Sequence, residues 1–137
     1  MSTPPKEAAL KEAALKEAPI YTATHDMLDW LLPHLEKWPR PQRFLLAREV
    51  MDSATQFYRL LLRARKVSAA QRAGVLLEAD TELETLKALL RLGVERRYLS
   101  LRQHEYISRQ LLTIGQQLGG WRRAIAGPAR PGGEKNG

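Results

Sequence analysis

Apolar residues recur at alternating three- and four-residue steps along most of the chain between positions 24 and 126. This spacing places them on one face of an α-helix, so it predicts amphipathic helices that each bury one side. Four such helices are expected, over about 24–38, 41–65, 69–93 and 101–126. The residues expected in the core are Leu28, Leu31, Leu32 and Leu35; Ala47, Val50, Ala54, Phe57 and Leu61; Leu76, Ala79, Leu83, Leu86 and Leu90; and Ile107, Leu111, Ile114, Leu118, Trp121 and Ile125.

Local signals at the helix ends agree with these boundaries. Thr24 is expected to cap the first helix, while Pro33 should kink it and Pro39 should stop it. The third and fourth helices open with Ser68-Ala69-Ala70-Gln71 and Ser100-Leu101-Arg102-Gln103, which match the capping box in which Ser and Gln satisfy each other's backbone amides. Because the helices are similar in length and joined by short connections, the expected fold is all-α, an antiparallel up-down-up-down four-helix bundle.

The first 18 residues follow a different pattern. Residues 6–18 repeat the unit Lys-Glu-Ala-Ala-Leu, which has a strong helix propensity. A five-residue period advances about 140° around a helix, so the leucines form no stripe that could pack on a core. We interpret residues 1–18 as a rigid helical extension, similar to the linkers of engineered fusions, with a natural low-complexity segment as the alternative. The bundle is expected over 19–126, and the Pro- and Gly-rich tail 127–137 is expected to be disordered.

Composition narrows the classes of function. The chain has no cysteine, which excludes disulfides and thiolate metal sites. No apolar run approaches the roughly 20 residues that span a bilayer, and the N-terminus lacks a hydrophobic signal core, so we expect a cytoplasmic protein without a membrane partner. His25, His34 and His104 stand apart, and motifs typical of serine hydrolases, P-loop NTPases and dinucleotide-binding enzymes are absent from the sequence. We therefore expect no catalytic residues, no metal site, no cofactor and no enzyme activity.

The net charge of +7 is distributed unevenly. Residues 40–72 hold eight basic and two acidic side chains, and residues 91–130 hold the same numbers, which gives about +6 for each block. Clustered Lys and Arg side chains bind polyanions by releasing counterions from phosphate backbones. The two blocks therefore indicate a nucleic-acid partner, RNA or DNA, with a solvated basic surface as the alternative.

Several of these cations follow helical spacings. Arg102, Arg109 and Arg123 are separated by multiples of seven residues on the fourth helix, away from its apolar seam. Arg suits phosphate because its planar guanidinium forms bidentate contacts. The candidate nucleic-acid or partner-binding residues are Arg59, Arg63, Arg65, Lys66, Arg72, Arg96, Arg97, Arg102, Arg109, Arg122 and Arg123. The alternative for any single arginine is an ion pair with an acidic residue of the third helix. Those acidic residues are Glu78, Asp80, Glu82 and Glu84.

Two consecutive glycines, Gly119 and Gly120, interrupt the fourth helix, where each costs about 1 kcal/mol relative to Ala. The close approach of another helix, from the same subunit or a neighbouring one, would explain them, with Trp121 packing alongside. A local break before a frayed last turn is the alternative. Gly119, Gly120 and Trp121 are therefore candidate oligomer-packing residues.

Four short stretches together resemble a known family. They are Pro19-Ile20-Tyr21-Thr22, Trp30-Leu31-Leu32-Pro33, Trp38-Pro39-Arg40 with Arg43-Phe44, and Ile114-Gly115-Gln116-Gln117-Leu118-Gly119-Gly120-Trp121. The likeness covers about Pro19 to Ile125. It is to the four-helix-bundle family that contains the accessory variability determinant of diversity-generating retroelements and the proteins encoded in 23S rRNA intervening sequences.

This resemblance implies a homopentamer around a central channel, with a basic surface that binds RNA or DNA. It also implies association with the retroelement reverse transcriptase in mutagenic retrohoming. Members of the family begin near the counterpart of Pro19, which implies that residues 1–18 were added. The alternative function, from a different class of protein, is that of an oligomeric scaffold or assembly protein, or a designed fusion building block, with no nucleic-acid role.

Overall fold

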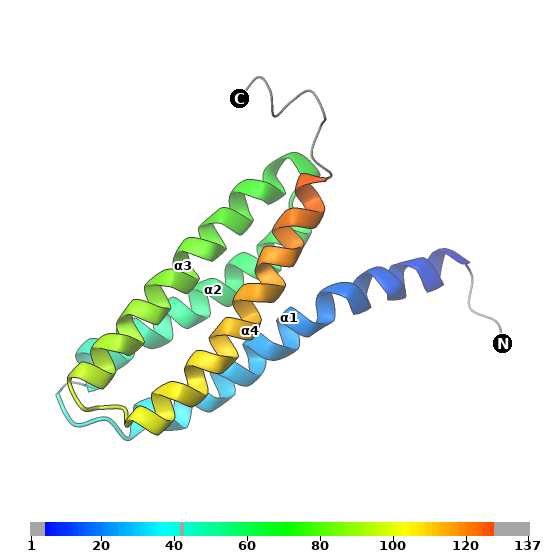
Figure 1. The fold of residues 1–137 in the computed structure, drawn as a ribbon. Coiled ribbons are helices and arrows are strands. Elements are labelled where there is room, and N and C mark those ends of the chain that lie inside the picture. The colour runs from blue at the N-terminus through cyan, green and yellow to red at the C-terminus, as the bar shows by residue number, and fades with distance from the viewer. Residues whose placement is uncertain (1–4, 42, 128–137) are drawn as a thin grey trace.

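The computed structural model describes residues 5–41 and 43–127 (Figure 1). Its elements are the α-helices α1 (Pro5–Glu36), α2 (Arg48–Lys66), α3 (Ala69–Glu95) and α4 (Leu101–Ala126), with a short π-helix, η1 (Arg43–Ala47), that leads into α2. No strand occurs within the described ranges. Consecutive helices run in opposite directions, and α4 closes the ring by packing against α1 as well as α3. The predicted all-α, up-down-up-down four-helix bundle is confirmed.

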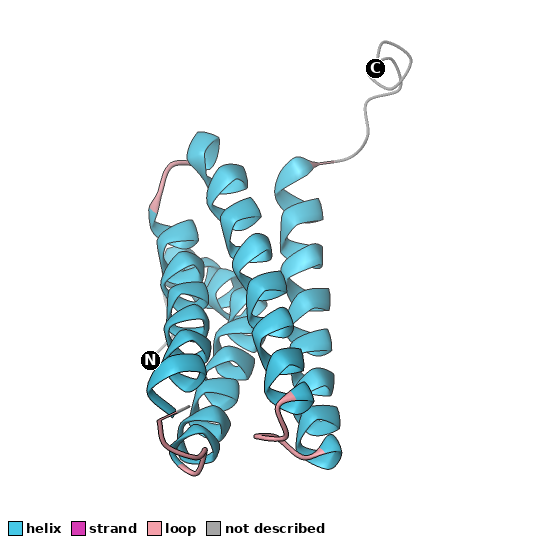
Figure 2. Cartoon of the chain, turned by 90° about the vertical axis from the view of Figure 1, so that its left-hand side faces the viewer, coloured by secondary structure: helices cyan, strands magenta, loops and turns pink. Residues whose placement is uncertain are grey.

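The connections define two ends of the bundle. The link from α1 to α2 and the turn from α3 to α4 lie at one end, which we call the α3–α4 end (Figure 2). The turn from α2 to α3 lies at the opposite end, beside the last turns of α4, and we call this the α2–α3 end (Figures 1 and 2). This division decides which of the candidate cations lie near one another.

The core follows the predicted seams closely on α2, α3 and most of α4. Every core residue predicted for the second and third helices is buried, Ala47 in η1 and the others on α2 and α3, and so are Ile107, Leu111, Ile114 and Leu118 on α4. On α1 the buried positions are Ile20, Thr24, Met27, Leu31 and Leu35. Leu28 is half-buried, and the prediction is wrong for Leu32, which is 49% exposed. Its Cβ points about 100° away from that of buried Leu31.

The last turns of α4 also depart from the predicted seam. Trp121 is half-buried, and Ile125 is 36% exposed because it lies in the final turn, next to the end of the helix at Ala126. The core therefore stops about two turns before α4 does.

The first helix begins much earlier than predicted. It runs without interruption from Pro5 through Pro19 and Pro33 to Glu36, and it ends before Pro39 as expected. Thr24 caps nothing, because it is buried in the middle of α1 and its hydroxyl donates to the Ile20 carbonyl at 2.7 Å. The strong helix propensity of the repeat explains the continuation on the N-terminal side of Pro19.

The N-terminal turns of α1 extend beyond the other three helices (Figure 1). Residues 5–18 are thus joined to the bundle by continuous helix, and the interpretation of residues 1–18 as an added segment stays a prediction.

One of the two predicted capping boxes forms. At the start of α4, the Ser100 amide donates to Gln103 Oε1 and the Gln103 amide donates to Ser100 Oγ, each at 3.0 Å. Ser68 is the N-cap of α3, but its side chain makes no capping bond, so that box is absent. The Ser68 carbonyl instead accepts from the amides of Gln71 and Arg72, at 3.0 and 3.1 Å.

The C-terminal end of α4 agrees with its stop signal. Gly127, the residue after the helix, has φ +74°, a left-handed value that glycine adopts without strain. The predicted disordered tail lies outside the described residues, apart from Gly127 itself.

Candidate nucleic-acid interface

The candidate cations divide between the two ends of the bundle. Arg63, Arg65, Lys66 and Arg72 flank the α2–α3 turn, and the last two turns of α4 bring Arg122 and Arg123 to the same end. Arg96, Arg97 and Arg102 flank the α3–α4 turn, while Arg59 and Arg109 lie within α2 and α4. Along α4, the rise from Arg102 to Arg123 is about 32 Å, at 1.5 Å per residue. The heptad-spaced arginines of α4 therefore do not form one compact site.

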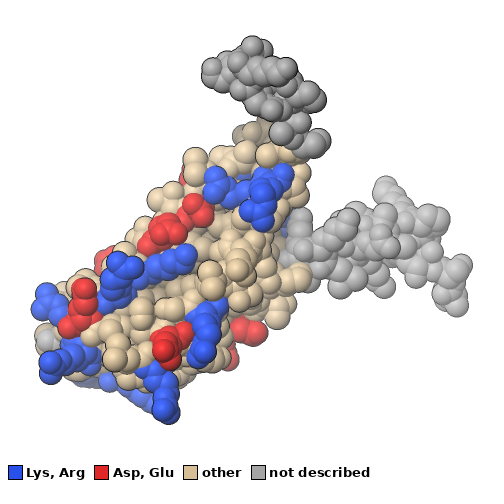
Figure 3. Space-filling model, viewed as in Figure 1, with Lys and Arg blue, Asp and Glu red and all other residues tan. Residues whose placement is uncertain are grey.

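The visible surface carries both signs of charge. On the face shown, groups of Lys and Arg side chains alternate with Asp and Glu side chains along the length of the bundle (Figure 3). This face is therefore not a continuous basic stripe.

Most of the candidate cations are exposed and free of ion pairs. Arg59, Arg63, Arg65, Lys66, Arg96, Arg97, Arg102, Arg109 and Arg123 are all exposed. Among the described residues, Arg122 is the one candidate that forms an ion pair, with Asp80 of α3 at 3.5 Å. Of the other acidic residues on α3, Glu82 accepts from the Ser53 hydroxyl at 2.6 Å and Glu84 lies 3.4 Å from Lys87. Intramolecular pairing thus accounts for Arg122 and leaves the exposed cations available.

Arg65 is held by an aromatic contact. Its guanidinium carbon lies 4.7 Å from the centre of the Tyr21 ring, within the range of a cation–π interaction. The Tyr21 hydroxyl donates to the Leu61 carbonyl at 2.8 Å, and its ring meets Trp121 edge-on at 6.3 Å. This cluster links α1, α2 and α4, and it places the charge of Arg65 at the α2–α3 end.

Arg72 has a structural contact that the sequence did not indicate. It is half-buried, and it donates from Nε to the Ala64 carbonyl at 2.7 Å and from Nη2 to the Val67 carbonyl at 3.0 Å. Both carbonyls belong to the end of α2, where helical acceptors lack intrahelical partners. Arg72 therefore stabilises the α2–α3 turn with its two hydrogen bonds. It does so at the start of α3, where the Ser68 side chain makes no capping bond.

Gly119 and Gly120 are covered by a side chain of their own helix. A Cβ atom on Gly119 would lie 3.3 Å from Arg123 Nη1, and one on Gly120 would lie 3.9 Å from Arg123 Nη2. No other helix of the chain comes within 4 Å of these positions among the described residues, and α4 continues unbroken to Ala126. Neither a close approach within the subunit nor a local break occurs here. Packing by a neighbouring subunit stays a prediction, and so does the oligomer role of Trp121.

Arg97 has an unusual backbone conformation in the α3–α4 turn. Its φ of 64° lies in the left-handed region that glycine usually occupies after a helix. The Tyr98 amide donates to the Gly93 carbonyl at 2.8 Å, which closes the end of α3. A non-glycine residue in this conformation costs about 1–2 kcal/mol.

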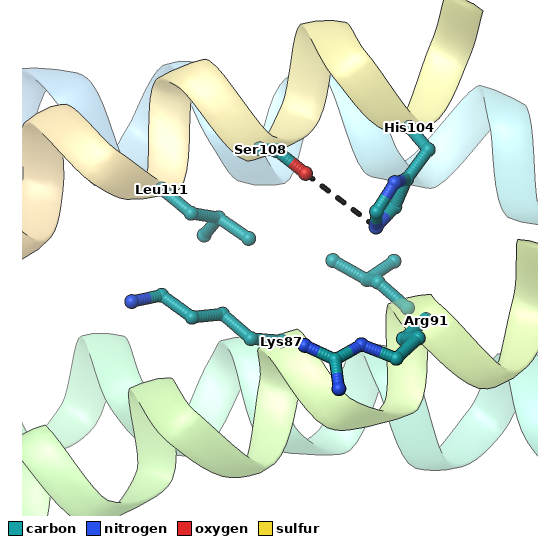
Figure 4. A pocket seen from close by; sticks show the side chains of 6 residues that line it. Lys87, Arg91, His104, Ser108 and Leu111 are labelled. Atoms are coloured by element: carbon teal, nitrogen blue, oxygen red, sulfur yellow. Dashed lines mark hydrogen bonds between the residues drawn. The ribbon is translucent and has the colours of Figure 1, made fainter. Parts of the chain in front are cut away.

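Two further features were missed by the sequence predictions. A pocket of about 130 Å³ between α3 and α4 is lined by Lys87, Leu90, Arg91, His104, Ser108 and Leu111 (Figure 4). At the α3–α4 end, a shallow apolar hollow of about 320 Å³ lies between η1 and α3, where Leu45 is 67% exposed and Leu92 is 38% exposed. The i, i+4 spacing of Lys87 and Arg91 could have indicated a pair of cations on one face of α3. The pocket was missed because the side chains opposite this pair come from α4.

The described part of the chain contains no group of three or more His, Cys, Asp or Glu side chains that could hold a metal ion. Of the helices described, none is long and apolar enough to cross a membrane.

The described residues thus form an all-α four-helix bundle whose two ends carry exposed arginines without ion pairs to other described residues. The chain belongs to the bAvd-like family, because the model of that family matches residues 20–125. The match starts directly after Pro19 and ends at Ile125, which confirms the resemblance drawn from the four sequence stretches. Comparisons with curated proteins and with solved structures find no match.

Proposed function

We propose that this protein is a noncatalytic accessory protein that binds nucleic acid through phosphate contacts and associates with a retroelement reverse transcriptase in mutagenic retrohoming. Membership of the bAvd-like family supports this assignment. The observation that carries the nucleic-acid part is the set of exposed arginines without ion pairs at the two ends of the bundle. Contacts of this kind position a polyanion by its backbone and read little base sequence.

The backbone conformation of Arg97 supports nucleic-acid binding at the α3–α4 end of the bundle. Side chains held in costly backbone conformations concentrate at functional sites, and Arg97 is a cation in such a conformation. Glycine would fit this turn better, so the fold alone gives no reason for an arginine there. Together with Arg96 and Arg102, it presents three exposed cations around one turn.

We further propose that the protein assembles with copies of itself. The family resemblance implies a homopentamer, and exposed apolar side chains such as Leu77 on α3 and Leu112 on α4 give the bundle surfaces that a neighbouring copy would cover. The same exposure favours the second candidate function, an oligomeric scaffold without a nucleic-acid role. The two candidates differ in whether the purified oligomer binds RNA or DNA.

Arg122 and Arg123 provide a matched test of the nucleic-acid function. Within the described residues Arg123 forms no ion pair, whereas Arg122 is already paired with Asp80. Binding of a fluorescent single-stranded RNA or DNA is measured by anisotropy at several salt concentrations. We expect Arg123→Gln to weaken binding and to lower the slope of log K against log salt concentration, and Arg122→Gln to have a smaller effect. If the wild-type oligomer binds neither RNA nor DNA, the scaffold function stands in place of this proposal.

A further inference from the structure

The pocket between α3 and α4 gathers cationic and hydroxyl groups from two helices. Lys87 and Arg91 come from α3, and His104 and Ser108 face them from α4 (Figure 4). Ser108 Oγ and His104 Nε2 lie 3.4 Å apart and share a hydrogen bond. The buried side chains of Leu90 and Leu111 complete the lining.

The lining is basic and holds no carboxylate. Lys87 and Arg91 are four residues apart on one helix, where like charges repel and destabilise the helix slightly. Glu84 offsets part of this charge, since its carboxylate lies 3.4 Å from Lys87 Nζ at the solvent side of α3. Arg91 has no ion pair within the described residues. The apolar side chains beside the cations lower the local dielectric and strengthen the field that an entering anion would feel.

The size and donors of the pocket suit one small oxyanion. A volume of about 130 Å³ leaves room for a single tetrahedral anion. Arg91 offers a planar fork of N–H donors, Lys87 offers an ammonium on a flexible stem, and Ser108 offers a hydroxyl. These are the groups that bind phosphate oxygens in proteins, with Arg acting as a bidentate donor.

We propose that this pocket binds a single phosphate group, held by Arg91 and Ser108, with His104 oriented by its bond to Ser108. Lys87 completes the site by turning from Glu84 toward the anion. The phosphate is either a free inorganic anion or one phosphate of a nucleic-acid strand. Binding of the free anion does not depend on the proposed nucleic-acid function, so the two proposals fail separately.

The test is a titration of the full-length protein with inorganic phosphate at constant ionic strength and pH, followed by ¹H–¹⁵N NMR. We expect saturating shifts at the amides of Arg91, His104 and Ser108. Arg91→Gln should weaken phosphate binding at least fivefold, whereas Arg48→Gln, at an exposed arginine of α2 outside the pocket, should leave it unchanged. Thermal unfolding of each variant checks that the fold is retained.

Glu84→Gln is a second variant, and it is expected to strengthen phosphate binding. It removes the carboxylate that competes for Lys87, so phosphate should bind two- to threefold more tightly. Three results would overturn the proposal: shifts that do not saturate, equal effects of Arg91→Gln and Arg48→Gln, or the same shifts with acetate in place of phosphate. The acetate result would assign the pocket to a carboxylate of a protein partner.

A second titration identifies the source of the phosphate. A fluorescent single-stranded oligonucleotide is titrated with wild type, Arg91→Gln and Arg123→Gln. If Arg91→Gln weakens both phosphate and oligonucleotide binding, the site takes a phosphate of the strand. If it weakens phosphate binding alone, the site takes the free anion. If wild type binds phosphate but no oligonucleotide, the pocket stands and the proposed nucleic-acid function is refuted.

Discussion

Replacing Arg72 with Met should destabilise the bundle, because Arg72 joins the end of α2 to the start of α3. Its Nε and Nη2 atoms donate to the Ala64 and Val67 carbonyls at 2.7 and 3.0 Å. Met retains most of the apolar length of the arginine side chain and removes both donors. The change in unfolding free energy therefore measures the two hydrogen bonds more than the loss of packing.

The magnitude follows from the surroundings of the two carbonyls. A hydrogen bond from a charged donor contributes about 1.5–3 kcal/mol. Arg72 is only half-buried and both acceptors end a helix beside a turn, so water replaces part of each bond in the variant. We therefore expect a loss of about 1.5 kcal/mol for the two bonds together. For a bundle of about this size, that loss lowers the melting temperature by about 5–8 °C.

The assay is thermal and urea unfolding followed by circular dichroism. Arg63→Met is the matched control, since Arg63 is an exposed arginine of α2 that pairs with no described acidic residue, and it should change stability by no more than about 0.5 kcal/mol. Arg72→Lys should recover part of the loss, because an ammonium reaches one carbonyl but lacks the fork that reaches two. Equal unfolding of Arg72→Met and Arg63→Met would refute the structural role. If Arg72→Met then also bound nucleic acid more weakly than Arg63→Met, Arg72 would be a binding residue instead.

Three further predictions concern the helix ends and close contacts. Ser100→Ala removes the Ser half of the capping box at α4 and should lower the unfolding free energy by about 1 kcal/mol, measured by urea unfolding. Gly93→Ala places a Cβ 3.0 Å from the buried Trp38 ring and should destabilise the protein by about 1–3 kcal/mol. Gly74→Ala, whose Cβ would meet nothing within 4 Å, should stabilise it by about 0.5–1 kcal/mol. Equal effects of the two variants in calorimetry would contradict this reasoning. Arg97→Gly should raise stability by about 1 kcal/mol and weaken oligonucleotide binding in the anisotropy assay, and a loss of stability would show that its conformation is not strained.

The helical seams could be predicted because each is a property of one helix. On α2 and α3, residues spaced by three and four fall on a single face whatever their neighbours do, and all of those predicted are buried. Two errors arose where the pattern admitted more than one register or boundary. Consecutive leucines at 31 and 32 made either position a candidate for the core, and the structure buries Leu31 alone. Thr24 has the residue type of a cap, but the helix-forming repeat before it carries α1 past that signal.

The candidate sites were harder to predict because they depend on which residues of different helices face each other. In an antiparallel pair of helices, residues about equally far from the connecting turn lie opposite one another. Arg91 and His104 are nearly equidistant from the α3–α4 turn, and so are Lys87 and Ser108. All four residues are present in the sequence, but their pairing depends on where the turn is centred. The left-handed backbone of Arg97 and the capping box at Ser100 fix that centre. The conformation of Arg97 could not be predicted, because arginine rarely adopts left-handed φ values. Once that turn is known, the phosphate pocket follows from the spacing on both sides of it. The same reasoning separates the arginines of α4, since a seven-residue period aligns them on one face while the length of the helix carries them to opposite ends.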